Sequence, residues 1–235
     1  MLLCMATIKI IGTSHIAPQS VKMVEKIISE EVPDIVAVEL DRKRLQALTH
    51  GERKMRLRDA RRVGLKGWLF ALIGSWIERK LGSKVGVMPG DEMLRAMSVA
   101  QRVGARLALI DQDIEITLKR FSKALTWKEK WRFVVDIVKG LIFRKGIEFD
   151  LSKVPPKELI TKLLDEVKVR YPNVHRVLVE ERNVFMARAL LQLGKRVPEG
   201  KIVAVVGAGH EDEIKRLLKM YLKQEILEGV KRSDA

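Results

Sequence analysis

The sequence predicts an α/β fold with a largely parallel central sheet. Four short runs rich in Val, Ile and Leu have the length of buried strands, at residues 7–11, 35–40, 106–110 and 201–206. Segments of helical length separate these runs, which favours parallel strands joined by crossover helices. The apolar fraction of 47% is that of a globular protein, and 235 residues are enough for one full-sized domain.

Helical periodicity predicts the elements that separate and follow these strands, at residues 18–31, 91–103, 172–193 and 211–224. Pro18 suits the first turn of a helix, where its missing N–H is not needed. Gly104 and Gly194 follow the expected ends of two helices, as is typical of C-terminal caps.

The net charge of +15 is concentrated in two segments. Residues 42–66 hold ten Lys and Arg against two acidic residues, and residues 117–145 hold nine against two, so the rest of the chain is neutral. All four tryptophans lie in or beside these segments. We therefore expect a single domain over residues 1–235 with two basic helical insertions, at about 42–88 and about 115–160.

Both basic segments have the pattern of amphipathic helices that carry tryptophan, at residues 66–80 and 118–142. One interpretation is that these helices pack on each other or across a homodimer interface. The other is that they bind an anionic membrane surface, as basic amphipathic helices with tryptophan do. No recognisable nucleic-acid motif accompanies the charge, so nucleic acid is not an expected partner.

The sequence favours a cytoplasmic protein, with peripheral membrane association as the alternative. Cys4 is the only cysteine, which excludes an internal disulfide and fits a reducing compartment. The first ten residues lack the features of a secretory signal. The longest apolar run, residues 68–77, has roughly half of the ~20 residues that a membrane-spanning helix needs. The scarcity of asparagine beside abundant Lys, Arg and Glu is typical of thermophilic proteins.

Four polar residues stand at the carboxyl ends of the predicted strands. His15 follows the first strand, Glu39 ends the second, Asp111 ends the third and His210 follows the fourth. In open α/β sheets the sites form beyond these strand ends, so we expect the four residues to converge. Histidine and carboxylate groups are suitable ligands for a divalent transition metal. Glu39 and Asp111 could instead cap strand or helix ends.

A further candidate lies on the helix expected at 172–193. Glu181 falls within its apolar stripe, which consists of Val174, Val177, Leu178 and Phe185. A carboxylate in such a stripe is costly to bury unless it is paired or bound. It could form a structural ion pair with Arg182, at the edge of the stripe, or with Arg188. Alternatively, it serves as a general base or orients ligands in the cleft.

Several stretches, in the expected order along almost the whole chain, resemble the TraB family of pheromone shutdown proteins. They are IIGTSHIAPQSV, DIVAVELDRKRL, MPGDEMLRAM, LALIDQDIEITLKRF, LVEERNVFMA and VAVVGAGH. The chain is also similar, more distantly, to the Tiki metalloproteases and to proteins with the erythromycin-esterase-like fold. The resemblance implies a mixed, mainly parallel central sheet with helices on both faces.

The resemblance also implies roles for the residues at the strand ends. His15 and His210 match the family's two Gly-x-x-His motifs, which are associated with metal binding or catalysis in the Tiki relatives. Glu39 matches the acidic residue of the VEL motif. The implied site holds a divalent metal (Mn, Co or Zn) through His15, His210 and a carboxylate, with Glu39 as first choice and Asp111 as second.

Other matched positions surround this set. Glu181 and Arg182 match the family's Glu-Arg motif, with Glu181 expected to accept a proton from water and Arg182 expected to steady an oxyanion. Glu92 matches the acidic residue of the Gly-x-Glu-Met stretch. Gln112 stands where a basic residue is expected, which weakens any substrate-anchoring role of that position.

The leading hypothesis is a metal-dependent hydrolase acting on peptide bonds, with a peptide or signal peptide as its substrate. The erythromycin-esterase-like relatives leave a metal-free hydrolase open, because a similar fold can use histidine and glutamate as general bases. The alternative of another class is a non-catalytic regulatory module that binds a peptide or associates with a membrane surface.

Overall fold

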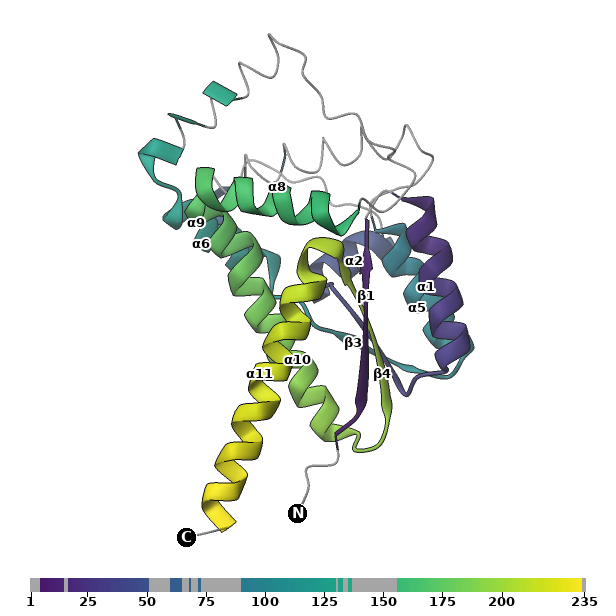
Figure 1. The fold of residues 1–235 in the computed structure, drawn as a ribbon. Helices are drawn as coiled ribbons and strands as arrows, with labels where there is room; N and C mark the ends of the chain where they lie inside the picture. The colour runs from purple at the N-terminus through teal and green to yellow at the C-terminus, as the bar shows by residue number, and fades with distance from the viewer. Residues whose placement is uncertain are drawn as a thin grey trace.

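The computed structural model describes residues 5–14, 17–50, 60–64, 68, 72, 90–129, 131–132, 135–136 and 156–233. Strands and helices alternate along the chain (Figure 1). In order they are β1 (Thr7–Thr13), α1 (Pro18–Glu31), β2 (Ile35–Val38), α2 (Arg42–His50), α3 (Ala60–Val63), α5 (Asp91–Arg102), β3 (Arg106–Leu109), α6 (Ile114–Ala124), α8 (Lys157–Arg170), α9 (Pro172–His175), η2 (Arg176–Glu180), α10 (Glu181–Arg196), β4 (Lys201–Gly207) and α11 (Ala208–Ser233).

The four described strands form one sheet in the order β1-β4-β2-β3. Every pair of neighbours is parallel, so the α/β class is confirmed, and no antiparallel pair occurs within the described part of the sheet. All four residues of β2 are buried, as are the six that follow Lys201 in β4. These central strands read as continuous apolar runs because helices cover both of their faces.

One face of the sheet is covered by α1 and α5, which lie side by side in Figure 1. The residues on the inner face of α5 follow helical spacing, and each is at most 1% exposed. They are Met93, Ala96, Val99 and Ala100. These side chains pack with Val24 and Ile28 of α1 against β2 and β4.

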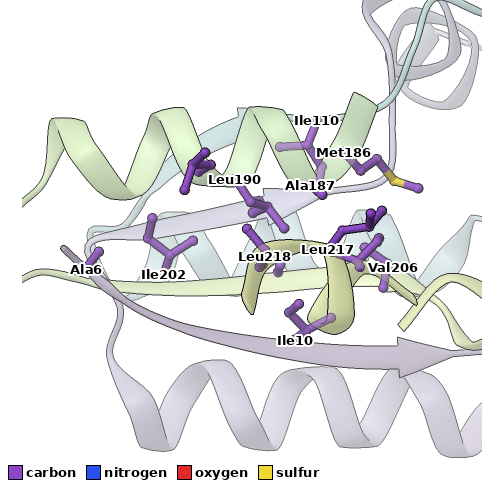
Figure 2. Close-up of a cluster of buried hydrophobic side chains, with 14 of the residues drawn as sticks. Ala6, Ile10, Ile110, Met186, Ala187, Leu190, Ile202, Val206, Leu217 and Leu218 are labelled. Atoms are coloured by element: carbon purple, nitrogen blue, oxygen red, sulfur yellow. The ribbon is translucent and has the colours of Figure 1, made fainter. Parts of the chain in front are cut away.

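The opposite face of the sheet is covered by α10 and α11. Figure 2 shows Met186, Ala187 and Leu190 of α10 facing the sheet, with Leu217 and Leu218 of α11 in the same cluster. The two helices close this second core over Ile10 and Ile202. Burial on both faces accounts for the three-layer arrangement of helix, sheet and helix.

The ends of two helices differ from the expectation. α10 continues to Arg196, so Gly194 lies inside the helix and does not end it. A Cβ atom on Gly194 would lie 2.9 Å from Cε of Met5, so the glycine allows the chain start to pack closely. α11 begins directly after β4 at Ala208 and, in Figure 1, extends well beyond the sheet.

The basic segments are only partly described. The helix expected at 66–80 lies outside the described residues except for Trp68 and Leu72. The apolar residues expected at helical spacing over 118–142 do not share one helix, because α6 ends at Ala124. A new helical turn begins where Oγ1 of Thr126 accepts from the backbone N–H of Glu129 (3.3 Å) and Oε2 of Glu129 accepts from that of Thr126 (3.0 Å).

Within the described ranges, no helix is both long enough and apolar enough to cross a membrane.

Candidate functional site

The carboxyl ends of the strands meet at one edge of the sheet, because the strands are parallel and in register. Thr13, at the end of β1, pairs with Gly207 at the end of β4. Val38 of β2 pairs with Val205 of β4 on one side and Leu109 of β3 on the other. The segments that follow these strands are therefore neighbours, as the sequence predicts. His15 itself lies outside the described residues.

Arg182, near the start of α10, is the centre of a buried cluster at this edge. Its Nε donates to Oδ1 of Asp111 (3.0 Å), and its Nη2 donates to Oδ2 of Asp111 (2.7 Å) and to Oε1 of Glu39. Its Nη1 lies 3.3 Å from both the carbonyl oxygen of Leu178 and Nε2 of His210. A guanidinium has five N–H groups, so each one has an acceptor here.

The charge of this guanidinium is strongly favoured. Burial alone lowers the pKa of Arg182, but the neighbouring Glu39 and Asp111 carboxylates outweigh it and raise the pKa above its usual range. The side chain of Arg182 is only 15% exposed, and those of both carboxylates are 2% exposed. The cluster is therefore a buried ion-pair network, in which one cation balances two anions with help from Arg44.

Asp111 is fully engaged by its neighbours. Its Oδ1 also accepts from the backbone N–H of Gln112 (2.8 Å), and its Oδ2 also accepts from Nη1 of Arg44 (3.1 Å). Together with the two bonds from Arg182, each oxygen receives two hydrogen bonds, which is the usual capacity of a carboxylate oxygen. Asp111 has no acceptor position left for a metal ion while both arginines stay in place.

Glu39 and His210 form the other half of the cluster. Oε2 of Glu39 accepts from the backbone N–H of Gly207 (2.6 Å), which ties the end of β2 to the end of β4. Oε1 of Glu39 lies 3.5 Å from Nε2 of His210. Nδ1 of His210 lies 2.6 Å from Oδ1 of the buried Asn183. Because an amide oxygen only accepts, Nδ1 donates its proton to Asn183, and Nε2 lies near Nη1 of Arg182 and Oε1 of Glu39.

Arg182 and Asn183 reach the cluster because the helix before them contains a π-helical turn. The segment expected as one α-helix is α9, then the π-helical η2, then α10. The backbone N–H of Glu181 donates to the carbonyl of Arg176, five residues earlier. A π turn adds about one residue, so the helical face after it is rotated by one position. Arg182 thus takes the inward place that straight α-helical spacing gives to Glu181.

Glu181 accordingly lies elsewhere. It forms an ion pair with Arg120 of α6 (3.0 Å), and within the described residues it pairs with neither Arg182 nor Arg188. Its side chain is 26% exposed and lines a hollow beside the cluster. Phe185, which α-helical spacing puts on the apolar face, is 44% exposed for the same reason.

Glu92 is buried, with 1% exposure, in the first turn of α5, where the helix dipole favours a carboxylate. Neither Arg182 nor Arg44 of the cluster pairs with it. Three of the expected residues are therefore brought together, namely Glu39, Asp111 and His210. Arg182 joins them as their central partner.

Sequence reasoning did not identify Asn183 and Arg44 as members of the site. Asn183 is one of only two asparagines in the chain, and it follows the Glu-Arg pair directly. That position next to Arg182 is the signal that could have identified it. Arg44 carries no such signal, since it is one of many basic residues in its segment.

The fit of a metal ion depends on donors that remain available. Within the described residues, no group of three or more His, Cys, Asp or Glu side chains is arranged to hold an ion. Oε1 of Glu39 and Nε2 of His210 are close enough to share one, and Asn183 holds His210 as outer partners of metal-bound histidines do. Both atoms also lie against Arg182 in the structure, so they become donors to an ion only where that guanidinium moves away.

Comparison with known proteins gives relatives that match most of this chain. It is 38% identical over 219 residues to an uncharacterized protein of Methanocaldococcus jannaschii, a match that covers 90% of this chain and 53% of the relative. It is 28% identical over 235 residues to the TraB domain-containing proteins of Mus musculus and Homo sapiens, covering 88% of this chain and 61% of each relative. The chain thus spans little more than half the length of these relatives. The model of the TraB/PrgY/gumN family matches residues 5–227, and the chain belongs to that family.

Proposed function

We propose that this chain is a metal-dependent hydrolase of peptide bonds, with its site at the carboxyl edge of the sheet. His15, Glu39 and His210 would hold a divalent ion such as Mn²⁺, Co²⁺ or Zn²⁺. The observation that carries the proposal is the orientation of His210, whose Nδ1 is held by Asn183 while its Nε2 faces Oε1 of Glu39. Buried polar pairs of this kind fix the tautomer and direction of a ligating imidazole.

A bound ion would polarise a peptide carbonyl and lower the pKa of a coordinated water. The residues of the chain would support that chemistry. The backbone N–H of Gly207 holds Oε2 of Glu39, so that Oε1 is directed toward His210. Nη2 of Arg182 donates to Oε1 of Glu39 and places a positive charge beside that carboxylate. Arg182 donates to Glu39 and His210 in the structure, and one Nη1 N–H would be released for an oxyanion when Nε2 of His210 holds an ion.

Glu181 is the remaining carboxylate at the rim of the cluster. It would accept a proton from water only after Arg120 releases it, because the pair is closed at 3.0 Å. The requirement is a modest one, since both side chains are partly exposed and such ion pairs are weak.

The test is metal binding by titration calorimetry and elemental analysis on the wild type and three variants. We expect the wild type to bind about one ion per chain and His210→Ala to lose it. Asn183→Ala should bind the ion about 10–100-fold more weakly, because the imidazole loses its outer partner. His50→Ala is the matched control, since His50 is exposed and lies outside the cluster.

Hydrolysis is then followed on a panel of fluorogenic peptides with and without the ion. Activity that needs the ion and disappears in His210→Ala supports the proposal. No binding after reconstitution, or unchanged binding in His210→Ala, overturns it.

An anionic membrane surface is the second candidate partner. Trp127 is 83% exposed and Trp131 is 70% exposed, although large aromatic side chains are normally buried. The exposed Lys123 and Lys128 lie beside them in sequence. Tryptophan favours the interfacial region of a bilayer, and each nearby lysine contributes about 1 kcal/mol of attraction to anionic lipid.

A further inference from the structure

A hollow of about 670 Å³ lies beside the ion-pair cluster, between α6, η2 and α10. Three arginines line it, Arg120, Arg176 and Arg188, and we call it the arginine hollow. In the function proposed above, Arg120 only holds Glu181, and Arg176 and Arg188 have no part.

The hollow holds more positive charge than its own carboxylates balance. Arg120 is paired with Glu181 (3.0 Å). Glu180, the second acidic residue in the lining, is 3.5 Å from Lys168 of α8, which lies outside it. Neither Arg176 nor Arg188 forms an ion pair within the described part of the chain.

The hydrogen bonds of these two arginines are equally sparse. Arg176 donates to Oδ1 of Asn173 (3.3 Å), which is a neutral acceptor. Arg188 is exposed, and the described residues supply it with no hydrogen-bond acceptor. Two guanidinium groups therefore face the hollow with donors available to an anion. Arginine is well suited to this, because its planar donors match the two oxygens of a carboxylate.

The hollow also has an apolar wall. Phe185 is 44% exposed, and Val184 and Ala189 lie next to it in the lining. An aromatic side chain left partly in water beside unpaired cations is typical of a surface that binds a ligand with both apolar and anionic parts. A glutamate or aspartate side chain, with its methylene groups and carboxylate, has that character.

The arginine hollow lies beside the candidate site, because two residues in its lining are chain neighbours of residues in the ion-pair cluster. Gln112 lines the hollow, and its backbone N–H donates to Oδ1 of Asp111 in the cluster (2.8 Å). Glu181 lines the hollow, and Arg182 follows it in the chain.

We propose that the arginine hollow binds an acidic side chain of the substrate peptide, next to the bond that is hydrolysed. Arg176 and Arg188 would pair with its carboxylate, and Phe185 would pack against its methylene groups. This inference rests on the proposed peptide hydrolase, and it adds a substrate class, namely peptides with Asp or Glu near the scissile bond.

The test compares a fluorescein-labelled peptide that contains glutamates with the same peptide carrying glutamines. Fluorescence anisotropy measures binding to the wild type, to the variant Arg176→Glu/Arg188→Glu and to Arg106→Glu. Arg106 is the matched control, because it is exposed at the start of β3 and therefore lies at the opposite end of the sheet. We expect the wild type to bind the glutamate peptide about tenfold more tightly than the glutamine peptide, and the double variant to lose this preference.

A wild type that binds both peptides equally, or a double variant that keeps the preference, overturns the inference. Its failure is distinguishable from failure of the proposed function, because cleavage is scored separately. Cleavage of neutral peptides with no preference for acidic ones leaves the hydrolase standing and removes the substrate class. Charge-dependent binding without cleavage of any peptide keeps the binding site and removes the hydrolase.

Discussion

Replacing Arg182 by methionine tests whether the cluster is a buried ion-pair network. Methionine is a shorter, unbranched side chain that keeps much of the volume and removes the charge and the donors. Both Glu39 and Asp111 lose hydrogen bonds in this variant, at a place where their side chains are 2% exposed. The structure allows the size of the effect to be worked out from what each carboxylate retains.

Asp111 keeps the pair with Arg44 and the backbone N–H of Gln112, so its charge stays compensated. Glu39 keeps the N–H of Gly207 but loses the guanidinium. We therefore expect Arg182→Met to lose the equivalent of one buried ion pair, the one between Arg182 and Glu39. Removing one partner of such a pair costs roughly 3–5 kcal/mol, a large share of the 5–15 kcal/mol that stabilises a typical domain.

The assay is urea denaturation followed by circular dichroism at neutral and at acidic pH. A buried carboxylate without its cation is less costly in the protonated form. The folded variant therefore binds protons more readily than the unfolded chain, and by linkage its stability falls as pH rises. We expect the deficit of Arg182→Met to be largest at neutral pH and smaller on acidification.

Two further variants keep the prediction testable if Arg182→Met does not fold. Arg182→Lys retains the charge but not the planar fork, and it should lose less stability. Adding Glu39→Gln to Arg182→Met removes the buried charge that loses the guanidinium, and it should restore part of the lost stability. Arg188→Met, on the exposed side of the same helix, should change stability by less than about 0.5 kcal/mol. A loss below about 1 kcal/mol in Arg182→Met, with no coupling to Glu39, would refute the reasoning.

Two other predictions concern regions outside the cluster. Burial raises the pKa of Asp41 in spite of the backbone N–H groups of Lys43 and Arg44. The folded protein therefore loses stability as pH rises from the pKa of Asp41 in the unfolded chain to its raised pKa in the folded protein. Asp41→Asn keeps the helix cap and should raise the free energy of unfolding by up to about 1 kcal/mol at neutral pH. Urea titrations should show this gain shrinking on acidification, and a gain that does not depend on pH would contradict the reasoning. If Trp127 and Trp131 dock on a membrane, the protein should co-sediment with vesicles containing anionic lipid and not with neutral ones. Replacing both tryptophans by alanine should then release it, and equal sedimentation of the variant would exclude that surface.

Much of the fold could be predicted from the sequence because its signals are local. The runs of Val, Ile and Leu identify all four described strands to within two residues at either end. Pro18 and Glu31 bound α1 as the periodicity predicts. Parallel pairing follows from the helices between the strands, and it brings Glu39, Asp111 and His210 to one edge. Strand order is not encoded in these signals, so the central place of β4 comes from the structure.

The prediction of which residues on the long helix face inward is wrong for an equally physical reason. A helical wheel assumes a constant angle per residue, and the π turn at Arg176–Glu180 breaks that assumption. Every residue after it is rotated by about one position. Arg182 and Met186 therefore face inward, where the wheel places Glu181 and Phe185.

The sequence by itself determined the strands, the helices between them and the polar residues at the strand ends, since each depends on neighbours within a few positions. Only the tertiary structure decided what those polar residues do to one another. Arg182, distant in the chain from Glu39 and Asp111, is the cation that both carboxylates bind, and Asn183 sets the tautomer of His210. Burial makes the difference, because a charge removed from water must be matched by whichever group the fold brings within hydrogen-bonding distance.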